Sequence, residues 1–158
     1  FPFQGSRKRA FFIGRIKMSD GRKAFKTKLK IGDGASPEVF TALPELFSVG
    51  PVGGSKELVD MTNHDTTGQY DYEVFDLEDG NELQFEANDI HGDTAQGLFR
   101  TAYSNSSKKN FQVLDRNSDG YQFPGVITKL ETDFSELKGK VVLRGTLKIA
   151  GTVTTVTH

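Results

Sequence analysis

The sequence contains no cysteine and no tryptophan among its 158 residues. The absence of cysteine excludes disulfide bonds, thiolate metal sites and cysteine nucleophiles. No apolar run approaches the roughly 18 residues that a membrane-spanning helix requires, so no membrane partner is expected. Glycine (17 residues) and phenylalanine (13 residues) are instead abundant. This composition is typical of β structure with many turns, and the length suits one domain.

Acidic residues are almost absent from the first 30 positions, which hold ten Lys and Arg but a single acid, Asp20. Residues 31–158 hold ten Lys and Arg against twenty Asp and Glu. A basic arm on an acidic body indicates either nucleic-acid binding or self-association of the arm with the body. Self-association is preferred, because no nucleic-acid-binding fold surrounds the arm.

Residues 1–17, "FPFQGSRKRAFFIGRIK", look detached from the rest of the chain, because Met18 opens "MSDGRKAF" like a natural start. They lack the small-residue cleavage site of a secretory signal. We therefore predict that residues 1–17 are a vector-derived or leader-like extension. Residues 18–158 are then expected to form a single domain.

Alternation of apolar and polar residues predicts roughly seven to nine strands, as in "AFKTKLKIG" and "ELQFEA". A second strand region is expected over residues 39–50, with Pro44 marking a bend or an edge, and a turn is expected at "DLEDGN". Helical periodicity is confined to residues 93–105, with Asp93 as N-cap and Gln96 in the position of a capping box. Residues 51–80 show little rigid pattern and are predicted to form a long loop region that contacts other molecules. The expected fold is mostly β, a sandwich or barrel with one flanking α-helix.

The stretch "DRNSDGYQF" at 115–123 resembles the first half of a calcium loop, with Asp115, Asn117 and Asp119 as candidate ligands. A helix–loop–helix calcium site also needs a glutamate at its twelfth position, where this chain has Val126. The same residue types are preferred in tight hairpin connections. We prefer the hairpin turn and expect no metal site.

Catalytic arrangements are not recognisable in the sequence. His64 lies beside Asp65, but no nucleophile elbow accompanies them. Two acid pairs, Asp71 with Glu73 and Glu82 with Glu86, alternate on strands opposite an apolar face. A solvated strand face explains these pairs better than a glycosidase pair does. We predict no enzymatic activity and no cofactor.

Four stretches, taken in order, carry a resemblance to a known family. They are "KTKLKIGDGASPEVFTALPELFSVGPVGGSKELVDMTNHDT", "TGQYDYEVFDLEDGNELQFEAN", "TAQGLFRTAYSNSSKKNFQVLD", and "YQFPGVITKLETDF" together with "KVVLRGTLKIAGTVT". From Met18 onward the chain resembles the major tail tube proteins of long-tailed (siphovirus-type) bacteriophages. The match covers about residues 24–155, and the turn "LDRNSDGYQF" is longer than the family pattern.

The resemblance implies a structural virion protein that assembles into hexameric rings. The rings stack into the tail tube, the conduit through which double-stranded DNA passes into the host without specific binding. It further implies other tail proteins as partners, a place in the virion tail and assembly in the host cytoplasm. The family's lumen is typically acidic, and Glu82 and Glu86, or Asp71 and Glu73, are the candidate lumen-lining residues.

The long loop region 51–80 is expected to reach a neighbouring subunit or ring. Its candidate contact residues are Gly53, Gly54, Ser55, Lys56, Met61, His64 and Asp65. The terminal segments 18–34 and 150–158 are expected to add contacts between rings. Two alternatives stay open: an inner tube protein of a secretion system with the same fold, and a calcium-binding β-sandwich module. An enzymatic function is the least favoured of these interpretations.

Overall fold

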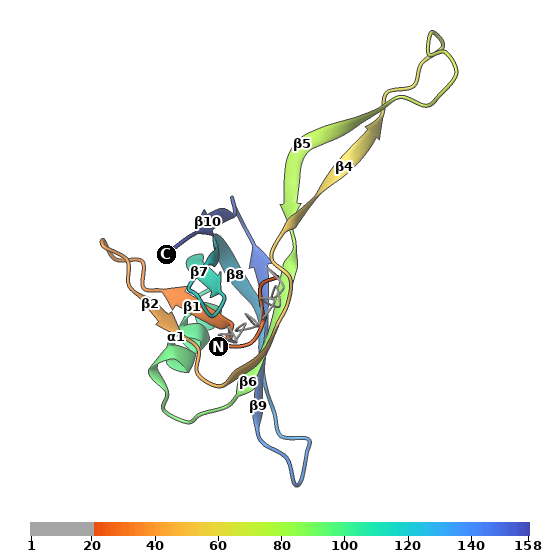
Figure 1. Ribbon diagram of the computed structural model, residues 1–158. Coiled ribbons are helices and arrows are strands. Elements are labelled where there is room, and N and C mark those ends of the chain that lie inside the picture. Colours follow the sequence, from red (N-terminus) through yellow and green to blue (C-terminus); the bar gives the residue numbers. More distant parts are fainter. Residues whose placement is uncertain (1–20) are drawn as a thin grey trace, which may run out of the picture.

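The structure, a computed structural model, describes residues 21–158 (Figure 1). The predicted extension 1–17 lies outside the described residues. A body of β-strands carries one helix on its flank, and a long two-stranded hairpin projects from it. Within residues 21–158, no helix has the length and apolar character to span a bilayer.

The body contains eight strands and one helix. They are β1 (Lys28–Gly32), β2 (Phe40–Ala42), β3 (Leu46–Val49), β6 (Glu82–Asn88), α1 (Thr94–Ser104), β7 (Lys109–Leu114), β8 (Gly120–Asp133), β9 (Val142–Ile149) and β10 (Thr154–Val156). The hairpin is made of β4 (Gly54–Asp60) and β5 (Tyr72–Gly80). The predicted order of strands, one helix and more strands is confirmed.

The body strands form a single antiparallel sheet in the order β2-β1-β7-β8-β9-β6-β3, with β10 beside β8. The 14-residue strand β8 joins two halves of this sheet: its first residues pair with β7 and its last residues pair with β9. Strands β1 and β3, which lie near opposite ends of the order, come into contact. The sheet therefore curves into a partly closed barrel around its core, as the mostly β fold class predicts.

Apolar residues at alternate strand positions fill the interior. Leu83, Phe85 and Ala87 of β6 are buried, as the alternation in "ELQFEA" predicts. Helix α1 closes one side of the core with Phe99, whose ring lies 5.3 Å from that of Phe85 and 5.8 Å from that of Phe111. The aromatic contacts continue from Phe111 to Phe123 of β8, so one cluster joins the helix to both halves of the sheet.

The ends of α1 agree with the prediction, but the capping box does not form. The Asp93 side chain accepts a hydrogen bond from the Gln96 amide, as an N-cap should. The Gln96 side chain does not return to the Asp93 amide. It is fully buried, accepts from the Ile90 N–H at 3.0 Å and donates to the Asn88 carbonyl at 2.8 Å. Gln96 therefore fixes the connection between β6 and α1.

Gln96→Leu is expected to lower the free energy of unfolding by about 1–3 kcal/mol, because it leaves two partly buried backbone groups without partners. Urea unfolding followed by circular dichroism measures this. The matched control is Gln84→Leu on the exposed face of β6, with an expected change of no more than about 0.5 kcal/mol. Equal stability of the two variants would show that Gln96 does not hold this connection.

Three local predictions need correction. The first strand begins at Lys28, and Phe25 lies outside it and is exposed, because Lys26 has a positive φ of 65° that breaks the extended backbone. The predicted strand 39–50 is two short strands separated at Pro44, and these occupy opposite ends of the sheet. The predicted turn at "DLEDGN" is extended: β5 runs to Gly80 and only Asn81 separates it from β6.

Candidate assembly surface

Most of the region 51–80, from Gly54 onward, is a β-hairpin, whereas the sequence predicts a long loop region with little rigid pattern. Among residues 21–158, strands β4 and β5 pair only with each other, with Leu58 opposite Val74 and Asp60 opposite Tyr72. The seven residues of β4 correspond to roughly 23 Å of extended chain. The hairpin points away from the body, with its connection 61–71 at the far end (Figure 1). We call residues 54–80 the hairpin.

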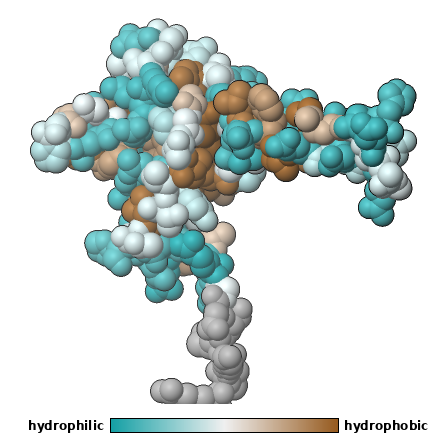
Figure 2. Space-filling view, turned by 90° about the horizontal axis from the view of Figure 1, so that it is seen from above, coloured by the Kyte–Doolittle hydropathy of each residue, from teal (hydrophilic) through white to brown (hydrophobic). Residues whose placement is uncertain are grey.

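The hairpin carries apolar side chains on both of its faces. Paired residues share a face, so Leu58 and Val74 lie on the same side as Tyr72, whose ring is 6.3 Å from that of Tyr70. The opposite side presents Val59, Met61 and Phe75 around a hollow of about 330 Å³. All of these side chains are exposed, and apolar surface is visible along the hairpin in Figure 2. Isolated two-stranded hairpins are marginally stable in water, and exposed apolar faces of this kind are typical of a surface that another molecule covers.

The hairpin is also strongly acidic. It contains eight Asp and Glu against one basic residue, Lys56. Asp79 pairs with Lys148 of β9 at 2.9 Å and so ties the base of the hairpin to the body. The other seven acids form no ion pair within residues 21–158. Any surface that covers the hairpin must therefore combine apolar area with positive charge.

The seven predicted contact residues fall into two groups that the structure does not bring together. Gly53, Gly54, Ser55 and Lys56 lie at the base of the hairpin, where the Gly53 carbonyl accepts from the Asn81 amide at 3.0 Å.

Met61, His64 and Asp65 belong to the connection at the far end of the hairpin. This connection is ordered by its own hydrogen bonds, including one from the Met61 amide to the Asp71 carbonyl at 2.8 Å. The Asp65 amide likewise donates to the Asn63 side chain at 2.8 Å.

Of the exposed apolar side chains of the hairpin, the sequence analysis names only Met61 as a contact residue. The signal was present in two adjacent apolar pairs, Leu58 with Val59 and Val74 with Phe75. Neighbouring residues of a strand point to opposite faces. Such a pair therefore indicates a strand without a solvent face.

The two acid pairs predicted for a lumen lie in different places. Asp71 and Glu73 belong to the hairpin, whereas Glu82 and Glu86 lie on the face of β6 that points away from the core. Glu82 lies nine positions after Glu73, roughly 30 Å along an extended chain. The two pairs therefore do not form one acidic surface within a subunit.

The exposed face of β6, β8 and β9 carries charges that compensate each other. Arg144 pairs with Glu86 at 2.9 Å and with Asp133 at 2.8 Å, and Lys129 pairs with Glu131 at 3.2 Å. Lys148, the third basic side chain of this face, pairs with Asp79 of the hairpin. Each of these basic groups already has a carboxylate partner, which lowers its attraction for other anions.

The stretch 115–120 is the tip of the β7–β8 hairpin, as predicted. One oxygen of the Asp115 carboxylate accepts from the amides of Asn117 and Asp119, and the other accepts from the Arg22 guanidinium at 2.9 Å. Asp119 accepts from the amide of His158 at 2.9 Å. This tip therefore holds both the start of the described chain and its C-terminal residue.

Charge on Asp115 is favoured by its neighbours. Burial of the carboxyl opposes ionisation, but the Asp119 and Asn117 amides and the Arg22 guanidinium outweigh it and lower the pKa of Asp115 below the usual 3.8. The folded pKa is thus below that of the unfolded chain. The stabilisation it brings is complete well above pH 3.8 and is lost as the pH falls through the folded pKa.

Calcium is expected to leave the thermal unfolding midpoint unchanged. Both Asp115 oxygens already accept hydrogen bonds, and residues 21–158 bring no group of three or more His, Asp or Glu side chains into a metal-binding arrangement. Differential scanning fluorimetry with and without millimolar calcium measures this. A rise in the midpoint that Asp115→Asn abolishes would restore the calcium interpretation.

Comparisons with solved structures define the class of fold. No known protein-family model matches the sequence, and no curated protein matches it. A chain in the virion of a native gene transfer agent particle matches with a TM-score of 0.67 and 16% identity, covering 87% of this chain and 100% of that one. A chain of the SPP1 tail tube matches with a TM-score of 0.65 and 15% identity, covering 85% of this chain and 78% of that one.

A third match comes from the sheath/tube terminator of an extracellular contractile injection system. Its TM-score is 0.66 at 15% identity, with 88% of this chain and 99% of that chain covered. The chain therefore has the fold of tail tube proteins, and the fold implied by the resemblance is confirmed.

Proposed function

We propose that this chain is a non-enzymatic structural subunit that assembles into hexameric rings stacked as a tail tube. The observation that carries the proposal is the hairpin, whose two apolar faces are exposed in the single subunit. Its support is the fold, which is shared along most of the chain with the SPP1 tail tube protein. A tail of an empty gene transfer agent particle, described with C6 symmetry, matches with a TM-score of 0.63 and supports the ring number.

In such a tube the exposed face of β6, β8 and β9 is the surface we propose for the lumen, with Glu82 and Glu86 as its acids. DNA adheres to proteins chiefly through Lys and Arg contacts to phosphate. The basic side chains of this face are held in ion pairs, so DNA would pass without being retained. We infer a place in the virion tail beside other tail proteins, with assembly in the host cytoplasm.

Electron microscopy with light scattering of the concentrated chain tests this function. Rings or tubes of uniform diameter are expected, because covering the hairpin removes apolar surface from water. A chain that stays monomeric at every concentration would contradict the proposal. Tubes of a contractile injection system are the second candidate, favoured by the match to the sheath/tube terminator.

A further inference from the structure

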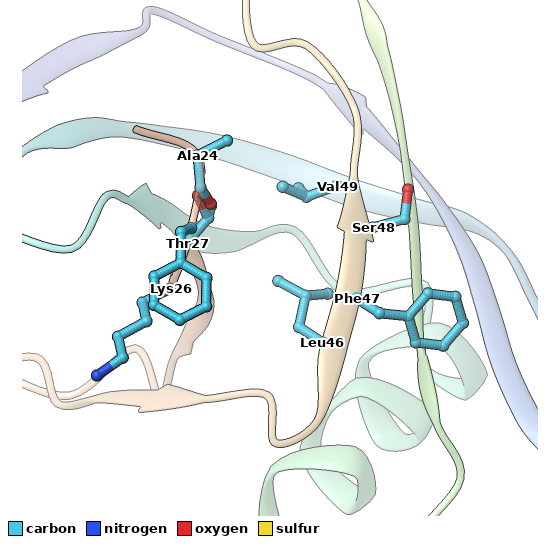
Figure 3. Close-up of a pocket in the computed structure, with 8 residues that line it drawn as sticks. Ala24, Lys26, Thr27, Leu46, Phe47, Ser48 and Val49 are labelled. Atoms are coloured by element: carbon cyan, nitrogen blue, oxygen red, sulfur yellow. Dashed lines mark hydrogen bonds between the residues drawn. The ribbon is translucent and has the colours of Figure 1, made fainter. Parts of the chain in front are cut away.

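A groove in the body has the properties that a partner for the hairpin needs. It lies between β3 and residues 24–27, which belong to the segment 21–27 that we call the lead-in, and has a volume of about 530 Å³. Leu46 and Val49 point from β3 toward the lead-in, whereas Phe47 and Ser48 point the other way (Figure 3). Phe25 lies at the groove with an exposed ring. The centre of the groove is therefore apolar.

One wall of the groove is an open sheet edge. In the part of the chain that the structure describes, β3 is hydrogen-bonded to β6 on one side, and no strand pairs with its other side. Open edges expose backbone donors and acceptors that proteins cover by assembly or by other elements. The groove thus offers backbone polar groups as well as apolar side chains.

The rim of the groove is basic. Residues 21–30 contain five Lys and Arg and no acid. Lys26 lines the groove, and Lys23 and Lys28 flank its lining residues 24–27 in the chain. All three lysines are exposed and form no ion pair within residues 21–158, whereas Arg22 pairs with Asp115. We call these three residues the rim lysines. No acid of residues 21–158 forms an ion pair that would compensate their charge.

The hairpin shows the complementary pattern. The hollow formed by Val59, Met61 and Phe75 has Glu73 and Asp76 beside it, so an apolar centre has an acidic border. In this structure the hairpin points away from the body that carries the groove (Figure 1). The same hairpin therefore does not fill the groove of its own subunit.

We propose that the hairpin of one copy docks into the groove of a second copy, with Glu73 and Asp76 facing the rim lysines. The inference rests on the proposed function and names the receiving surface. Each copy then contributes its hairpin to one neighbour and receives the hairpin of another. Such a head-to-tail contact closes into a ring when its rotation allows.

Charge reversal on the full chain tests this pairing. The hairpin-reversed variant carries Glu73→Lys and Asp76→Lys, and the rim-reversed variant carries Lys23→Glu and Lys26→Glu. Each alone is expected to raise the critical concentration for assembly by about 100-fold or more, because like charges then meet. The control, Lys138→Glu with Lys140→Glu, makes the same change of charge at the exposed β8–β9 turn and is expected to assemble like the wild type.

Restoration is the decisive result. A chain with both reversals, or an equal mixture of the two singly reversed variants, is expected to assemble within about 10-fold of the wild-type critical concentration, because opposite charges meet again. If neither restores assembly, or if rim reversal behaves like the control, the groove is not the receiving surface, although wild-type rings leave the proposed function standing. A wild-type chain that stays monomeric overturns both proposals.

Discussion

Excision of the hairpin is expected to leave a folded monomer that no longer forms rings. The variant replaces residues 54–80 with two glycines. Gly53 and Asn81 are already hydrogen-bonded to each other at 3.0 Å, so the ends can be joined without strain on the body. Residues 54–79 are exposed except for the partly buried Thr66, and the core loses none of its side chains. The effect on assembly is therefore expected to be complete.

Light scattering and circular dichroism separate assembly from folding in this variant. The free energy of unfolding is expected to change by no more than about 1 kcal/mol, chiefly through the lost exposed ion pair of Asp79 and Lys148. Removal of residues 53–66 alone would leave β5 without its partner strand, so both strands must be removed together. A matched variant keeps the hairpin backbone but carries Val59→Ser and Phe75→Ser, and it should also fail to assemble. Rings formed by the excised chain would contradict an assembly role for the hairpin.

Phe99→Ala is expected to lower the free energy of unfolding by about 3–5 kcal/mol. The Phe99 side chain is fully buried and lies within 5.3 Å of the Phe85 ring and 5.8 Å of the Phe111 ring, between centroids. Its removal opens a cavity where α1 meets both halves of the sheet. Such a loss is a large part of the stability of an ordinary domain.

Urea unfolding of Phe99→Ala is best compared with Tyr103→Ala in the same helix. Tyr103 is 42% exposed, and its truncation is expected to cost about 1 kcal/mol or less. Similar losses for the two variants would show that α1 does not close the core through Phe99.

Where one face of a segment is buried, the sequence predicted the structure well. In β6 and β9 the buried residues alternate with polar ones, and Leu83, Phe85, Leu143 and Leu147 are all in the interior. In α1 the predicted N-cap, Asp93, is also correct. These patterns are local, since a single period or cap determines them.

The hairpin escaped prediction for a physical reason. Secondary-structure patterns describe a chain with one side in water and the other in a core, whereas the hairpin has no core beneath either face. Pairs of apolar neighbours such as Val74 and Phe75 give no clear alternation, so the segment looked irregular. The surface that we propose covers it belongs to another copy, and one chain considered alone does not contain that information.

The side-chain role of Gln96 escaped prediction for a different reason. Its position three residues after Asp93 fits a capping box, but its hydrogen bonds go to the backbone at Asn88 and Ile90. The partners of the Gln96 side chain depend on how the connection after β6 folds over the helix. The position of Asp115 at a hairpin tip was easier to predict from the sequence, because the turn residues determine that tip locally.

The most direct test of the assembly role is a cryo-EM reconstruction of the assembled full chain. We predict six-fold rings in which the hairpin of each subunit is covered by its neighbours and Glu82 and Glu86 face a central channel. An assembly in which the hairpins project freely into solvent, with these glutamates on the outer surface, would contradict the proposed function.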